Sequence, residues 1–118
     1  MITNESMDQV FHALAHQTRR TILDLLRENP GWPVGRLAAQ FDCSRIAVMN
    51  HLGVLETAGL VVSEKDGRSR RLYLNQVPIQ MIYERWTDEY AAHWGERVTS
   101  IKRAAERAAG DTQERKKD

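Results

Sequence analysis

The 118-residue chain has one cysteine, three prolines and no long hydrophobic run. A lone cysteine, Cys43, cannot form an internal disulfide, which is typical of proteins from a reducing compartment. Every apolar segment is shorter than the roughly 20 residues that span a membrane. The start of the chain, Met1–Ser6, has no basic stretch followed by an apolar one, so it predicts no signal peptide. We therefore expect a cytoplasmic protein that does not interact with membranes.

The sequence also lacks the signals of an enzyme. It has no Gly-rich phosphate loop, no nucleophile elbow and no framed pair of carboxylates. The spacing of its acidic residues is that of charges on helix surfaces, as for Asp24, Glu28, Asp88 and Glu89. We expect neither catalysis nor a cofactor.

An excess of charge of one sign is absent as well, because the net charge is only +1. Total charge therefore does not argue for nucleic acid, and the distribution of charge has to be considered instead. Between Val61 and Asn75, four cations, Lys65, Arg68, Arg70 and Arg71, outnumber two anions, Glu64 and Asp66. This segment is locally basic.

The length predicts one small domain, whose stability dimerisation would increase. We expect it to span residues 1–109, followed by a disordered tail at 110–118. Helical spacing of apolar residues predicts a first helix that begins at Asn4 or Ser6 and a second that Thr18 caps. The second helix should end before the Asn29–Gly31 breaker, and Pro33 then fits the first turn of a third.

A helix with clear ends follows that third helix. Ser44 is its expected N-cap, and Gly59 its expected left-handed residue past the C-terminus. The expected buried or partly buried positions are Ile46, Val48, Met49, Leu52 and Leu55, whereas Arg45, Asn50 and Gly53 should face outward. Residues 34–58 thus predict a helix-turn-helix. The run at 61–74, with an Asp66-Gly67 turn, predicts a hairpin wing. The fold class is mainly α, with a small β-hairpin wing.

A winged helix-turn-helix places one helix in a DNA groove, so we expect double-stranded DNA as a partner. The start of the reading helix favours phosphate, Asn50 suits an adenine edge, and Arg45 suits guanine or phosphate. For His51, packing within the domain is a stronger interpretation than a phosphate contact. The predicted DNA-contacting set is Ser44, Arg45, Ala47, Val48, Asn50 and His51 on the helix and Arg68, Arg70 and Arg71 on the wing.

The last part of the chain predicts one long amphipathic helix at 78–109, with apolar residues in steps of three and four. Its aromatic series favours a dimer interface against the first helix. The expected interface residues are Val10, Phe11, Leu14, Ile82, Trp86, Tyr90, Trp94 and Ile101. A pocket for an aromatic or hydrophobic effector between the subunits is an alternative use of the same residues.

Three segments together resemble the ArsR-type (ArsR/SmtB) winged-helix repressors: Ala13–Leu23 (ALAHQTRRTIL), Ser44–Leu52 (SRIAVMNHL) and Leu55–Val61 (LETAGLV). The resemblance covers residues 5–105. The segment Pro78–Thr87 (PIQMIYERWT) is similar to a branch of that family without the usual metal sites. The resemblance implies a homodimer that binds a palindromic operator and represses transcription.

Metal and redox sensing are the nearest alternatives. Metal sensors of this family carry Cys-x-Cys in the helix that here spans residues 34–41, and this helix has no cysteine. The last helix offers only His93, with acidic residues at the wrong spacing, and His12 and His16 lack a third ligand. Cys43, near a helix N-terminus and Arg45, could be redox-sensitive, although a small apolar filler is the commoner role. We expect no metal site. A winged helix that binds only proteins is a further alternative.

Overall fold

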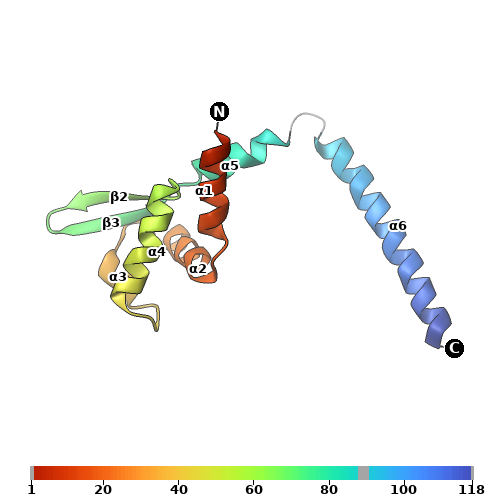
Figure 1. The fold of residues 1–118 in the computed structure, drawn as a ribbon, viewed down its shortest axis with the longest axis horizontal. Coiled ribbons are helices and arrows are strands. Elements are labelled where there is room, and N and C mark those ends of the chain that lie inside the picture. The colour runs from red at the N-terminus through yellow and green to blue at the C-terminus, as the bar shows by residue number, and fades with distance from the viewer. Residues whose placement is uncertain (1, 88–90, 118) are drawn as a thin grey trace. The chain divides into compact units, whose positions relative to one another are not determined.

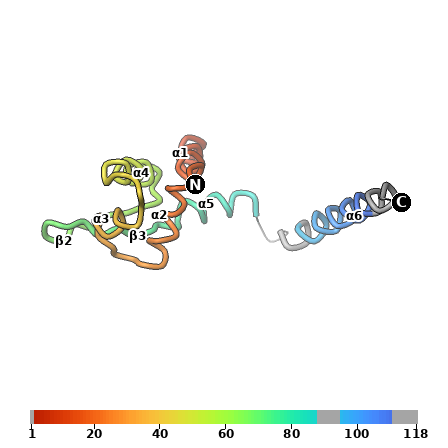
Figure 2. Tube along the Cα trace, turned by 90° about the horizontal axis from the view of Figure 1, so that it is seen from below, coloured from red at the N-terminus to blue at the C-terminus, as the bar shows by residue number. Residues whose placement is uncertain are grey.

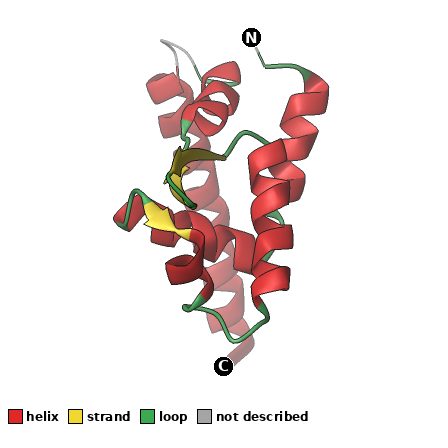
Figure 3. Ribbon diagram, turned by 90° about the vertical axis from the view of Figure 1, so that its left-hand side faces the viewer, coloured by secondary structure: helices red, strands yellow, loops and turns green. Residues whose placement is uncertain are grey.

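In the computed structural model, the backbone is described for residues 2–87 and 91–117, and side chains for residues 2–87 and 95–110 (Figure 1). The chain divides into two compact units, Met1–Tyr83 and Glu84–Asp118. Helices make up most of the described chain, and strands are confined to one small sheet (Figure 3). The expected class, mainly α with a hairpin wing, is confirmed.

The elements follow one another as α1 (Asn4–Leu14), α2 (Gln17–Glu28), β1 (Trp32–Pro33), α3 (Val34–Ala38), α4 (Arg45–Thr57), β2 (Val61–Asp66), β3 (Ser69–Leu74), α5 (Val77–Arg85) and α6 (Ala91–Lys117). Side-chain caps set several helix starts. Thr3 Oγ1 accepts from the backbone N–H of Ser6, and Ser44 Oγ accepts from that of Ala47, both at 3.1 Å. Each cap satisfies a backbone donor that the helix itself leaves unpaired.

The sheet is antiparallel with the order β1-β3-β2. The hairpin register runs from Val61 opposite Leu74 to Asp66 opposite Ser69, and the hairpin projects beyond the helices of the first unit (Figures 1 and 2). Strand β1 was not expected from the sequence. It is only two residues long and pairs with β3 through Trp32 opposite Leu72, a contact between distant segments that leaves no local periodicity.

The hydrophobic core lies where α1, α2, α3 and α4 meet the base of the hairpin. Side chains of this kind each contribute about 1.5–3 kcal/mol on full burial. The largest fully buried ones are Ile22, Leu26, Leu37, Leu55, Leu60, Leu72, Val10 and Val48. The core therefore fixes one face of α4 and anchors the wing.

The prediction of a single C-terminal helix at 78–109 is wrong, because α5 ends at Arg85 and α6 begins at Ala91. Thr87 falls in the interval, and threonine side chains compete with helical backbone hydrogen bonds. Helix α6 also continues to Lys117, past the tail expected from residue 110. Its last residues are mostly good helix formers and include no proline, which accounts for the extension. The division between units falls within α5 and not at residue 109.

Two glycines of the helix-turn-helix region should respond oppositely to alanine. Gly59 has a φ of +78°, where a side chain is strained, whereas Gly53 lies in α4 with open space around its Cβ position. We expect Gly59→Ala to lower the free energy of unfolding by about 1–2 kcal/mol. Gly53→Ala should raise it by about 1 kcal/mol. Urea unfolding of both variants at one protein concentration measures this, and changes of the same sign would contradict the assigned conformations.

Candidate nucleic-acid interface

Helix α4 has an inner face and an outer face with different chemistry. Val48, Leu52 and Leu55 are buried on the inner face. The outer side exposes Arg45, Ile46, Met49, Asn50 and Gly53. The Ser44 cap at its N-terminus is also exposed, and Ala47 is half-buried. Helix α4 is thus held by its buried face and exposes a mixed polar and apolar surface on the other side.

Two sequence predictions on this helix are wrong. Val48 was expected to contact DNA, but its side chain is 0% exposed and belongs to the core. Ile46 and Met49 were expected to be buried or partly buried, but they are 74% and 39% exposed. Residues two apart are separated by roughly 200° around a helix, so Ile46 and Val48 cannot both face the core.

A groove lies between the outer side of α4 and the wing. Its volume is about 460 Å³, and it is lined by Pro33, Val34, Gly35, Arg45, Ile46, Met49, Asn50, Arg68, Ser69 and Arg70. The structure thus brings together four of the residues predicted to contact DNA: Arg45, Asn50, Arg68 and Arg70. Ile46 and Met49 join them, although their apolar character had suggested a place inside the protein.

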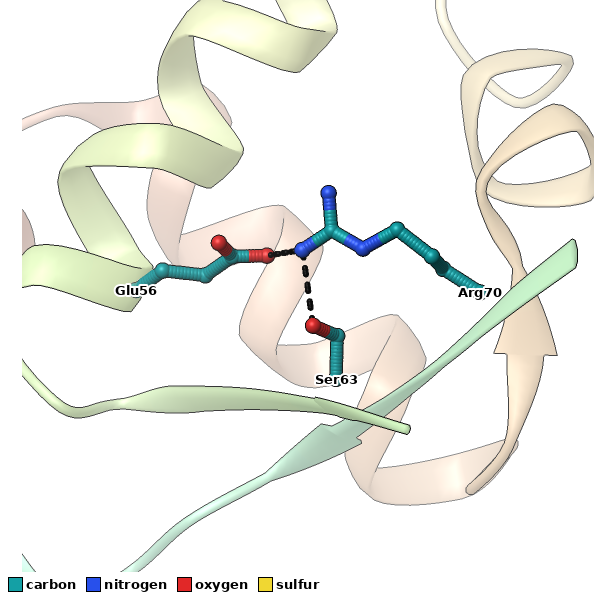
Figure 4. Close-up of polar contacts among 3 residues, drawn as sticks. All are labelled: Glu56, Ser63 and Arg70. Atoms are coloured by element: carbon teal, nitrogen blue, oxygen red, sulfur yellow. Dashed lines mark hydrogen bonds and ion pairs between the residues drawn. The ribbon is translucent and has the colours of Figure 1, made fainter. Parts of the chain in front are cut away.

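Arg70 connects the wing to α4. Its Nη2 donates to Glu56 Oε1 at 2.6 Å and to Ser63 Oγ at 2.7 Å (Figure 4). Glu56 lies in the last turn of α4 and Ser63 on β2, so a single guanidinium joins the helix to both strands of the hairpin. An exposed ion pair contributes only about 0–1 kcal/mol to stability. Its main effect is on the position of the wing.

The other two arginines of the wing differ in their surroundings. Arg71 Nε donates to Asp66 Oδ2 at 2.7 Å and its Nη1 to the Gly31 carbonyl at 3.2 Å, so this side chain fastens the hairpin to the β1 side. The hydrogen bond and charge of Asp66 raise the pKa of Arg71. Arg68 lies in the turn, is exposed, and makes no ion pair within the part of the chain that the structure describes.

His51 lies in a cluster that joins three helices. Arg19 Nη1 lies 3.2 Å from His51 Nδ1, and the ring of His16 is centred 4.5 Å from that of His51. Arg19 is only 9% exposed and also donates to the carbonyls of Ala13 and His12, at 2.9 and 3.1 Å. These partners agree with the interpretation that His51 packs and hydrogen-bonds within the domain. The role of Arg19 was not predicted from the sequence, because its partners lie up to 32 positions away.

The cluster sets the protonation of His51. A guanidinium can only donate, so the Nδ1 of His51 has to accept, which requires an unprotonated nitrogen at that position. Burial lowers the pKa of His51 from the ordinary value of 6.5, and the neighbouring charges of His16 and Arg19 lower it further. His51 is therefore neutral at physiological pH.

The residues expected at a dimer interface occupy different environments. Val10 is 1% exposed and belongs to the core, so its assignment to an interface is wrong. Leu14 and Ile82 are partly buried against the same core. Phe11, Trp86 and Ile101 are exposed. Tyr90 and the side chain of Trp94 lie outside the described residues, and so does the effector pocket that they would line.

The described residues provide neither a three-ligand metal site nor a membrane-spanning helix. No group of three His, Cys, Asp or Glu side chains there could hold a metal ion. Asp88, Glu89 and the side chain of His93 are not described. Cys43 is an exposed free thiol in the turn before α4, and so is not a buried filler. None of the described helices is long and apolar enough to cross a membrane.

The His51 cluster predicts that stability depends on pH. In the unfolded chain His51 takes up a proton near its ordinary pKa of 6.5, whereas the folded protein resists it until lower pH. Stability should be greatest above that value and fall as the pH drops from about 8 to about 5. His51→Asn keeps an acceptor for Arg19 but does not titrate. The variant should therefore lose less folding stability than the wild type when the pH falls. Urea unfolding across this pH range measures the free energy of unfolding of the wild type and of His51→Asn. His12→Asn, which replaces an exposed histidine, is the control. Equal losses of stability in the wild type and in His51→Asn would contradict the prediction.

Comparison with known proteins places these features in a family. A family model described as a helix-turn-helix domain matches residues 14–64. The uncharacterized HTH-type transcriptional regulator YuzN of Bacillus subtilis is 38% identical over 91 residues, which cover 72% of this chain and 99% of that protein. The transcriptional repressor SdpR of the same organism is 32% identical over 74 residues, covering 63% and 81%.

A solved structure agrees in fold as well as in sequence. An ArsR-like transcriptional regulator from Rhodococcus sp. RHA1 superposes with a TM-score of 0.64 and 31% identity, covering 86% of this chain and 93% of that one. This chain belongs to the ArsR family of winged helix-turn-helix transcriptional regulators.

Proposed function

We propose that the protein acts in the cytoplasm as a homodimeric repressor that binds a palindromic operator. The observation that carries this proposal is the groove in which Arg45 and Asn50 of α4 face Arg68 and Arg70 of the wing. Cations and an amide gathered along one groove suit phosphate and base edges. Similarity to the repressor SdpR supports repression as the direction of regulation.

The start of α4 enters the major groove in this proposal. Its free backbone N–H groups and Arg45 approach phosphate or a guanine edge, while Asn50, farther along the same exposed side, meets an adenine edge. The wing reaches the neighbouring backbone or minor groove through Arg68, which has no internal ion pair among the described residues. Ser44 and Ala47 flank these contacts at the first turn.

The remaining wing arginines have mainly positioning roles. Arg70 lines the groove but is tied to Glu56, so its charge is partly neutralised before DNA arrives. Arg71 is tied to Asp66 and the Gly31 carbonyl and does not line the groove. His51 holds α4 through Arg19. The phosphate contacts therefore fall chiefly to Arg45 and Arg68, with Arg70 as a weaker contributor.

Dimerisation rests on exposed apolar surface outside the groove. Phe11 on α1 is 50% exposed, and on α5 Val77, Ile79 and Tyr83 are 59%, 40% and 61% exposed. Exposed apolar side chains that form one contiguous patch mark an interaction site, and we expect these four to contribute to such a patch. A two-fold dimer would present two α4 helices to successive major grooves, about 34–36 Å apart.

Selection of bound sequences from a random pool of duplex DNA tests the function. We expect an imperfect palindrome, a complex that contains two chains by light scattering, and affinity that falls steeply between about 50 mM and about 200 mM salt. Enrichment of a single unrepeated site would contradict the dimer. Absence of both enrichment and salt dependence would instead favour a winged helix that binds proteins.

Arginine substitutions test which side chain of the wing contacts the phosphate backbone of DNA. Loss of one phosphate contact should reduce the slope of log affinity against log salt by about one unit. We expect this for Arg68→Ala, and a smaller change for Arg71→Ala because that side chain already has internal partners. Arg27→Ala, an exposed arginine of α2 that does not line the groove, is the control. An unchanged affinity and slope in Arg68→Ala would refute the role of the wing.

A further inference from the structure

The exposed side of α4 carries two apolar side chains amid polar ones. Ile46 is 74% exposed and Met49 is 39% exposed, and both line the groove with Arg45 and Asn50. Neither belongs to the hydrophobic core or packs against it as a partly buried neighbour. Folding of the described unit therefore does not account for an isoleucine in the first turn of this helix.

The major groove offers one apolar group to such side chains. Thymine carries a C5-methyl group there, whereas the other base edges present hydrogen-bond donors and acceptors. Contact between this methyl group and an aliphatic side chain removes apolar surface of both from water. The two side chains stand three positions apart on one helix, which places their Cβ atoms about 5–6 Å from each other. This distance spans one or two steps of duplex DNA, at about 3.4 Å per step.

The charged side chains around this apolar surface favour DNA as its occupant. Arg45 lies directly before Ile46, Asn50 lies directly after Met49, and Arg68 and Arg70 stand across the groove. A surface bordered by cations suits the phosphate backbone. An apolar centre bordered by phosphate-binding side chains fits a base edge that lies between two phosphate rows.

We propose that Ile46, with Met49 beside it, reads thymine methyl groups in each half-site of the operator. This inference rests on the proposed function, and adds to it the base and the atom that are recognised. Ile46 is β-branched and stiff at χ1, so its contact is restricted to one place. Met49 is flexible and adapts to the neighbouring step. Thymine is therefore expected at one or two fixed positions of each half-site.

Uracil substitution tests the contact, because uracil differs from thymine only by the missing methyl group. The probe is the most enriched duplex from the random pool, with each thymine replaced in turn by uracil. Removal of one methyl group from an apolar contact should weaken binding about fourfold. We expect this loss at one or two positions per half-site and little change elsewhere.

Variants of Ile46 assign the contact to its side chain. Ile46→Ala should bind thymine and uracil duplexes equally well at the position that Ile46 contacts and keep the difference at the step that Met49 contacts. The wild-type salt dependence should remain, because no phosphate contact is lost. Ile46→Val should retain part of the discrimination. Val62→Ala, which alters a 50% exposed side chain that does not line the groove, should retain all of it. Thermal unfolding of each variant shows whether the fold is intact.

The outcomes separate this inference from the proposed function. Selective, salt-dependent binding with no thymine-to-uracil difference would overturn the reading role of Ile46 and leave the repressor proposal intact. A difference that persists in Ile46→Ala at every sensitive position would also overturn the role of that residue. Absence of any selective duplex binding would overturn both proposals.

Discussion

The buried guanidinium of Arg19 constrains much of the first unit. Burial of a charged group costs free energy unless its hydrogen-bond donors have partners. The N–H groups of Arg19 donate to two carbonyls in the last turn of α1 and lie within hydrogen-bond distance of His51 of α4. Cations are favourable at a helix C-terminus, so the end of α1 both accepts the hydrogen bonds and stabilises the charge. One side chain of α2 thereby fixes the positions of the helices on either side of it. Because α4 is held from within at His51, its opposite side is left exposed to solvent.

A second contact extends this constraint to the wing. Arg70 joins β3 to the end of α4 through Glu56 and to β2 through Ser63 (Figure 4). Core packing holds the base of the hairpin against α4, and this exposed, salt-sensitive ion pair adds a second link between the two walls of the groove. In the proposed complex, α4 keeps its position through the core, and the hairpin adjusts to the DNA backbone when a phosphate competes with Glu56 for Arg70. This difference suits a surface that reads bases on one wall and backbone on the other.

Local sequence signals predicted most of the elements but not their long-range contacts. Ser44 and Gly59 mark both ends of α4 because capping depends on a few adjacent residues. The burial of Val48 and the exposure of Ile46 depend on the direction from which the core meets the helix, and the apolar residues of α4 point in several directions. Similarly, β1, the Arg19–His51 contact and the Arg70–Glu56 pair join segments far apart in the chain. The break between α5 and α6 was missed because the apolar spacing continues across Thr87 and Asp88.

The low net charge of +1 provides little long-range attraction for DNA, and internal pairing reduces the free charge of the wing further. Two of the three wing arginines are neutralised by Glu56 and Asp66, which leaves few cations for phosphate. Binding without sequence preference depends almost wholly on such contacts, so it should be weak in this protein. Discrimination between sites then depends on contacts with bases, and apolar contacts with thymine add to it without raising the affinity for DNA in general. A reading surface that combines isoleucine, methionine and asparagine with few free cations therefore favours specificity over general affinity.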